Sequence, residues 1–141
     1  MAKDNSCMYC TENQALQDLM IPICDLTASR LYLFRNQAYR GRCVLAWKDH
    51  VNEYFDLTAE EAALFAEDMR RVSAAISKAF SPKKVNLGMY NDKGTHLHCH
   101  IVPKYEGGLS FGSTFEMNPQ PAVLLSDAEY EEIIAAIRKA L

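Results

Sequence analysis

The sharpest alternation of polar and apolar residues falls in residues 96–102. In an extended strand, successive side chains point to opposite faces of a sheet. The polar positions of this segment are His96, His98 and His100. The apolar positions between them are Leu97, Cys99 and Ile101. We therefore expect a strand with three imidazoles on one face and a dry core on the other, ending at Pro103, which has no N–H to donate.

The longest helical pattern covers residues 58–80. Thr58 and Glu61 have the spacing of a capping box, which predicts the start of the helix, and Pro82 predicts its end. Apolar residues recur at helical spacing along one side, at Leu64, Phe65, Met69, Val72, Ile76 and Phe80. The charged residues that we assign to the solvent side are Glu60, Glu67, Asp68, Arg70, Arg71 and Lys78.

Two apolar runs, residues 29–34 and 41–47, flank a turn signal and predict a hairpin. Residues 84–90 predict another strand, which the turn signal of residues 91–94 joins to the histidine strand as an antiparallel neighbour. This arrangement brings the polar residues of that strand and turn close to the histidines.

Two further segments have helical patterns. Residues 11–20 are weakly helical, whereas Ser126 and Glu129 form a second capping box that opens a helix running to Leu141. Together the elements predict an α+β fold in a single domain spanning residues 1–141. We expect about five antiparallel strands, with the long helix packed on the sheet and a C-terminal helix beside it.

Composition narrows the classes of function. Apolar residues make up 49% of the chain and charged residues 23%, with a net charge of −3, which argues against a nucleic-acid binder with a basic surface. No apolar run approaches the roughly 20 residues that span a bilayer. Residues 1–6 carry no apolar signal region, so we expect a cytoplasmic protein without a membrane partner.

Cysteine and histidine supply the candidate chemistry. Cys7 and Cys10 form a Cys-x-x-Cys pair, which by itself fits half a zinc site, a redox pair or chance. A redox pair should open a helix after a strand, and nothing strand-like precedes Cys7, so half a zinc site is favoured. Three of the four histidines share one short strand, which favours metal binding or catalysis over ordinary surface histidines.

The chain resembles the histidine-triad (HIT) family, in its zinc-binding, diadenosine polyphosphate hydrolase-like branch. The resemblance rests first on His-x-His-x-His followed by two apolar residues and Pro103. Residues 41–51, ending Lys-Asp-His-Val, are similar to a second family segment, and Asp-Leu-Thr-x-Glu-Glu at 56–61 is similar to the opening of its long helix. The likeness extends over roughly residues 7–112.

The resemblance implies a nucleotide hydrolase or nucleotidyl transferase that acts at an α-phosphate of dinucleoside polyphosphates or nucleoside phosphoramidates. His98 would be the nucleophile and form a covalent nucleotidyl-histidine, which splits one difficult step into two. Its other ring nitrogen would be held as a donor by a backbone carbonyl from a nearby strand. His100 would hold a proton and contact the phosphoryl oxygens.

The resemblance also implies which other residues contact the nucleotide. The expected contacts are Asn36, Asn86, Asn91, Thr95 and Arg42. Many family members have a histidine where this chain has Arg42, and an arginine where it has Lys104. Arg42 therefore replaces a supporting imidazole and could contact phosphate itself.

Zinc is the cofactor that the resemblance implies. In one branch of the family the ligands occupy the positions of Cys7, Cys10, His50 and His96. A closed Cys₂His₂ tetrahedron is a structural site without an open position for water. Family members commonly form homodimers, so we expect one here.

Two other classes of function remain open from the sequence. The first is a nucleotide-binding or zinc-dependent interaction module without turnover. The second is a metalloenzyme with a catalytic metal on the three histidines, which would need a nearby carboxylate such as Glu53, Asp56 or Asp92.

Overall fold

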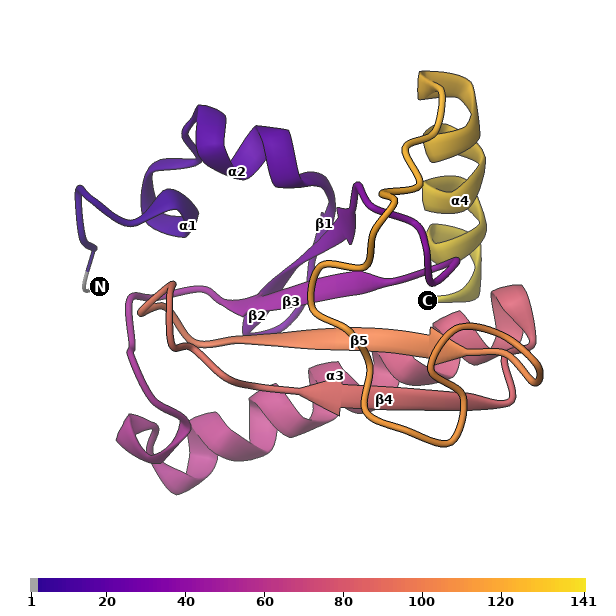
Figure 1. Cartoon of the computed structure of the whole chain (residues 1–141). Helices are drawn as coiled ribbons and strands as arrows, with labels where there is room; N and C mark the ends of the chain where they lie inside the picture. Colours follow the sequence, from indigo (N-terminus) through magenta and orange to yellow (C-terminus); the bar gives the residue numbers. More distant parts are fainter. Residues whose placement is uncertain (1–2) are drawn as a thin grey trace.

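The computed structural model describes residues 3–141 and contains one five-stranded antiparallel sheet (Figure 1). The strand order across the sheet is β1-β2-β3-β5-β4. The strands are β1 (Met20–Asp25), β2 (Ser29–Phe34), β3 (Cys43–Trp47), β4 (Lys84–Gly88) and β5 (His98–Lys104). This confirms the expected α+β class and its antiparallel sheet.

Helices cover both faces of the sheet. They are α1 (Met8–Thr11), α2 (Gln14–Leu19), α3 (Ala59–Phe80) and α4 (Asp127–Ala140), with a 3₁₀ turn at Tyr54–Asp56. Figure 1 shows α3 running along the face opposite to the N-terminal helices α1 and α2. The buried residues of α3 and α4 join one core with the sheet, which includes Leu97, Cys99 and Ile101. The face that carries His98 and His100 is covered by a smaller cluster around Tyr9, Leu16 and Phe34.

The capping boxes set the starts of both long helices as expected. The Thr58 hydroxyl accepts from the backbone N–H of Glu61, and the Glu61 carboxylate accepts from that of Thr58. Ser126 and Glu129 make the same pair of contacts at α4. Leu64 departs from the predicted apolar side of α3, because 44% of its surface is exposed.

Two strands differ from the prediction. β1 has no counterpart among the predicted elements, because Pro22 and a bulge between Pro22 and Cys24 interrupt its pattern. β5 continues through Pro103, which pairs with Val85 of β4. The pairing of β5 with β3 already stops at Ile101. Pro103 therefore breaks no hydrogen bond with β3, although it has no N–H to donate.

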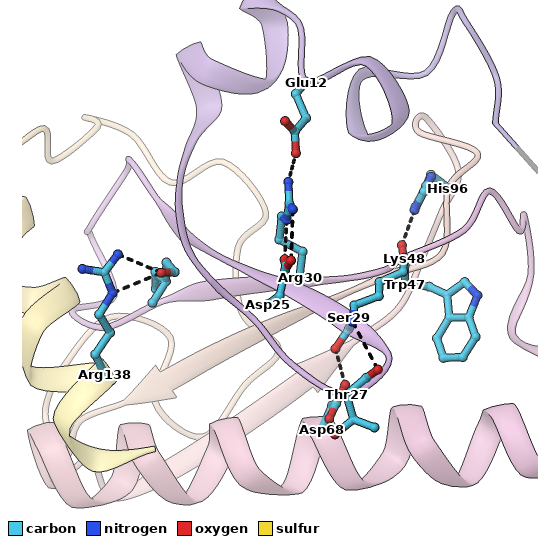
Figure 2. A network of polar contacts seen from close by, with 11 residues as sticks. Glu12, Asp25, Thr27, Ser29, Arg30, Trp47, Lys48, Asp68, His96 and Arg138 are labelled. Carbon is cyan, nitrogen blue, oxygen red and sulfur yellow. Dashed lines mark hydrogen bonds and ion pairs between the residues drawn. The ribbon is translucent and has the colours of Figure 1, made fainter. Parts of the chain in front are cut away.

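Asp68 corrects the expected solvent side of α3. Its side chain is fully buried, and its Oδ2 accepts from the backbone N–H of Ala28 at 2.9 Å and from the Ser29 hydroxyl at 2.6 Å. Figure 2 shows this carboxylate reaching from α3 to the start of β2. A charged side chain at a helical position next to apolar ones therefore fastens α3 to the sheet.

No helix within residues 3–141 is both long enough and apolar enough to cross a membrane.

Replacing Asp68 with Ala tests this anchor. The change leaves the Ser29 hydroxyl and the Ala28 N–H buried without an acceptor, so we expect the free energy of unfolding to fall by about 3 kcal/mol. Urea denaturation measures the effect. The exposed neighbour Glu67→Ala is the control and should change stability by no more than about 0.5 kcal/mol. Equal effects of the two substitutions would contradict an anchoring role.

Candidate functional site

His98 lies at the start of β5, and its ring has a fixed tautomer. Nδ1 is 2.6 Å from the carbonyl oxygen of His96. A carbonyl only accepts, so Nδ1 carries the proton and Nε2 keeps its lone pair. The carbonyl thus comes from the residue two positions earlier, not from a nearby strand as expected. Burial lowers the pKa of His98 below its usual value, which favours the neutral imidazole that a nucleophile requires.

His100 follows on the same face of the sheet. The centres of the His98 and His100 rings are 5.2 Å apart, and Nδ1 of His100 lies 3.1 Å from Nη2 of Arg42. Burial and the neighbouring Arg42 charge lower the pKa of His100 to about 3. We expected His100 to hold a proton. At neutral pH the ring is uncharged and carries one N–H, which is the proton that remains available.

The two rings face a cavity of about 540 Å³, a volume typical of small-molecule sites. Apolar side chains form much of its wall, including Leu19, Phe34, Phe115 and Met117. The turn between β4 and β5 supplies its polar side, with Asn91, Asp92, Lys93 and Gly94. A ring nitrogen with a free lone pair therefore lies in a pocket with one apolar and one polar side.

A second group of polar side chains lies beside the cavity and includes the remaining histidine of the triad, His96. Its members are Cys7, Cys10, His50 and His96, whose ligand atoms all lie within 4.8 Å of one another. His96 precedes β5 rather than belonging to it. Its Nε2–H donates to the carbonyl of Trp47 at 2.7 Å (Figure 2), which leaves Nδ1 free to face the two thiols.

The spacing of these atoms fits zinc. A tetrahedral ion with typical Zn–S and Zn–N bonds separates its ligand atoms by ~3.3–3.8 Å. Sγ of Cys7 is 3.4 Å from Nδ1 of His96, and Sγ of Cys10 is 3.4 Å from Nδ1 of His50 and 3.6 Å from Nδ1 of His96. Two thiols and two imidazoles with matching separations make this a candidate structural metal site, and a bound ion would join the N-terminal segment to the start of β5.

The expected nucleotide contacts are distributed unevenly. Asn91 lies in the cavity wall, adopts a left-handed backbone conformation with φ 59°, and its Oδ1 accepts from the His98 N–H. Asn86 is half-buried on β4, on the same face as His100, and Thr95 is exposed beside His96. Neither lines the cavity as far as residues 3–141 define it.

Asn36 and Arg42 have other partners. The Asn36 amide donates to the carbonyl of Pro119 and accepts from the N–H groups of Ala38 and Val123, so it fastens the long segment before α4. Arg42 has no exposed surface and lies behind His100. Neither side chain presents a free donor to the cavity.

Two aromatic residues of the site carried no recognisable signal in the sequence. Tyr9 lies between the paired cysteines, and its ring centre is 5.0 Å from that of His96 and 5.2 Å from that of His98. The ring centre of Phe115 is 6.2 Å from that of His100. It fits there because Gly88, which pairs with His100, has no side chain, and a Cβ would come within 2.8 Å of the Phe115 ring.

The sequence is similar to a known family of domains. The profile of the HIT domain matches residues 23–107. "Protein hit" of Bacillus subtilis (strain 168) is 24% identical over 124 residues, which cover 77% of this chain and 83% of that relative.

Two solved structures share the fold. The crystal structure of a histidine triad protein from Sinorhizobium meliloti 1021 has a TM-score of 0.83 at 22% identity, covering 92% of this chain and 95% of that one. That of a zinc-bound histidine triad family protein from Mycobacterium smegmatis has a TM-score of 0.65 at 21% identity, covering 96% and 92%. Since the profile spans more than half of the sequence, this chain belongs to the HIT domain family.

Proposed function

We propose that the protein is a nucleotide hydrolase or nucleotidyl transferase that acts at an α-phosphate through a covalent nucleotidyl-His98 intermediate. Membership of the HIT family supports nucleotide binding and hydrolase or transferase activity in general. The observation that carries the proposal further is the tautomer of His98. The hydrogen bond from Nδ1 to the His96 carbonyl leaves Nε2 as a neutral nucleophile in a ring that lines the cavity.

The chemistry follows from this arrangement. The Nε2 lone pair forms a P–N bond while the bond from phosphorus to the leaving group breaks. Water, or an acceptor in the case of transfer, then attacks phosphorus and breaks the P–N bond, which releases the nucleotide and restores the neutral ring. The proton that the attacking oxygen loses passes to solvent, which in turn protonates the leaving group. The remaining N–H of His100 supplies a hydrogen bond to charge that develops on the phosphoryl oxygens.

The proposed substrate class follows from the two sides of the cavity. Phosphate lies over His98 and His100, and the apolar wall around Leu19 and Phe34 accepts a nucleobase. Dinucleoside polyphosphates and nucleoside phosphoramidates both present an α-phosphate with a leaving group. A screen of the two classes, quenched in alkali because P–N bonds are acid-labile, would identify the substrate and trap the intermediate on His98.

Replacing His98 with Asn tests the nucleophile. The amide has no lone pair of comparable basicity, so turnover of the best substrate should fall more than about 10³-fold. Nucleotide binding, measured by calorimetry, should persist, and the covalent adduct should disappear from intact-mass spectra. Undiminished turnover would contradict the proposal. Wild-type protein that binds nucleotides and turns over none would instead support a non-catalytic binding module.

We also propose that Cys7, Cys10, His50 and His96 hold a structural zinc ion. Metal analysis should find about one zinc per chain, and Cys7→Ser should release it. The thermal unfolding midpoint should fall in that variant and after chelation, because the ion joins the N-terminal segment to the sheet. Cys24→Ser is the matched control, since this half-buried cysteine of β1 lies outside the cluster and should keep the zinc. Zinc retained by Cys7→Ser would identify other ligands.

We propose, finally, that the chain forms a homodimer through β4. This strand ends the sheet, so one row of its backbone groups has no neighbouring strand within residues 3–141. Leu87, in the middle of β4, is 51% exposed.

Light scattering should give the mass of a dimer, and Leu87→Lys should shift it towards the monomer. The control Leu124→Lys changes an equally apolar and more exposed residue away from β4 and should leave the mass unchanged. A monomeric wild type would exclude this interface.

A further inference from the structure

Arg42 is a buried cation without a carboxylate partner. It lies just before β3, has no exposed surface, and forms no ion pair within residues 3–141. Its Nη1 donates to the carbonyls of Met117 and Glu116 at 2.9 and 3.4 Å. The central carbon of the guanidinium, Cζ, lies over the Phe34 ring, 4.1 Å from its centre. These contacts fix the side chain in one orientation.

Nη2 of Arg42 is directed at His100, whereas the buried Nε has no hydrogen-bond partner within residues 3–141. Nη2 lies 3.1 Å from Nδ1 of His100, and it also approaches the Met117 sulfur at 3.3 Å. A guanidinium only donates, so Nδ1 of His100 must accept. The ring proton of a neutral His100 is then on Nε2, the nitrogen that is not taken up by Arg42.

Charge acts in the same direction as this hydrogen bond. A second proton on His100 would have to occupy Nδ1, in contact with the Arg42 cation and away from solvent. The other titratable groups that line the cavity beside this ring are His98 on the same strand, Tyr9, Tyr90, and Asp92 and Lys93 of the turn. None of them contacts His100 as Arg42 does, so the guanidinium determines the state of the ring.

We propose that Arg42 is a positioning residue that holds His100 as a neutral imidazole with its single proton on Nε2, available to a phosphoryl oxygen. The role rests on the proposed function of the cavity. It differs from the expected nucleotide contact of Arg42, because the guanidinium acts through His100.

The wild-type protein tests the first half of this proposal without any substrate. Long-range ¹H–¹⁵N spectra distinguish protonated from unprotonated ring nitrogens, and His100→Gln assigns the signals of His100. We expect Nδ1 of His100 to be unprotonated and Nε2 protonated, without change from pH 8 down to about 5. A ring protonated at Nδ1, or one that becomes an imidazolium in that range, would overturn the proposal.

Kinetics of Arg42→Met test the second half. Methionine fills the space between Phe34 and Phe115 without a donor or a charge. We expect kcat to fall about 10- to 100-fold with little change in KM, because a hydrogen bond of the transition state is weakened and no ground-state contact is lost. The His100 spectrum of this variant should lose its single tautomer. Arg42→Lys keeps the charge and one donor and should recover part of kcat.

Arg40→Met is the matched control. Arg40 is exposed and lies over Phe80, so its loss should change neither kcat nor the His100 spectrum. A rise of KM alone in Arg42→Met would mean a direct nucleotide contact and would refute the positioning role, as would full activity with an unchanged spectrum. If the wild type turns over no nucleotide, the proposed function fails, while the spectra still decide whether Arg42 sets the tautomer. If Arg42→Met does not fold, the wild-type spectrum and Arg42→Lys still decide.

Discussion

The hydrogen bond from His98 Nδ1 to the His96 carbonyl is the interaction on which the rest of the site depends. His96 is fixed at three points: Nε2–H donates to the Trp47 carbonyl, Nδ1 faces the thiols of the metal cluster, and its carbonyl holds the next histidine. Any movement of His96 would therefore disturb both the Cys₂His₂ cluster and the orientation of the His98 ring. An ion bound by His96 at one end of β5 would therefore also fix the direction of the Nε2 lone pair of His98 in the cavity.

The N-terminal segment belongs to this system although it precedes the sheet. Arg30 of β2 pairs with both Glu12 and Asp25, which anchors the end of α1 to the sheet (Figure 2). Between the two cysteines, Tyr9 lies against both His96 and His98. The segment therefore supplies two thiols to the cluster and also covers the histidines with an aromatic ring. Burial lowers the pKa of His98, which favours its neutral form.

The parts that the sequence predicted well are those set by local physics. Capping boxes and helical spacing located α3 and α4, and alternation placed Leu97, Cys99 and Ile101 in the core. The metal cluster followed from the family resemblance. What the sequence could not predict depends on contacts between distant positions. The helical pattern assigns Asp68 to the solvent side, and only the folded structure shows that it binds Ser29. Asn36 likewise forms hydrogen bonds with backbone groups more than 80 residues away. Periodicity contains no information about such partners, and β1 was missed because a proline and a bulge break its pattern.

Two residues of the same type perform opposite tasks in this site, and one partner of each decides which. The partner of His98 is an acceptor, so the ring presents a lone pair; the partner of His100 is a donor, so the ring retains a proton on its other nitrogen. An imidazole at position 42, as many family members have, could accept or donate according to its own protonation. Burial lowers the pKa of Arg42 only to about 10, so Arg42 remains a charged donor at neutral pH. The position of the proton on the His100 ring therefore does not depend on the protonation of its neighbour. The exchange of histidine for arginine therefore replaces an adjustable partner with a fixed one, and places a permanent positive charge behind the imidazole that faces the position proposed for the phosphate.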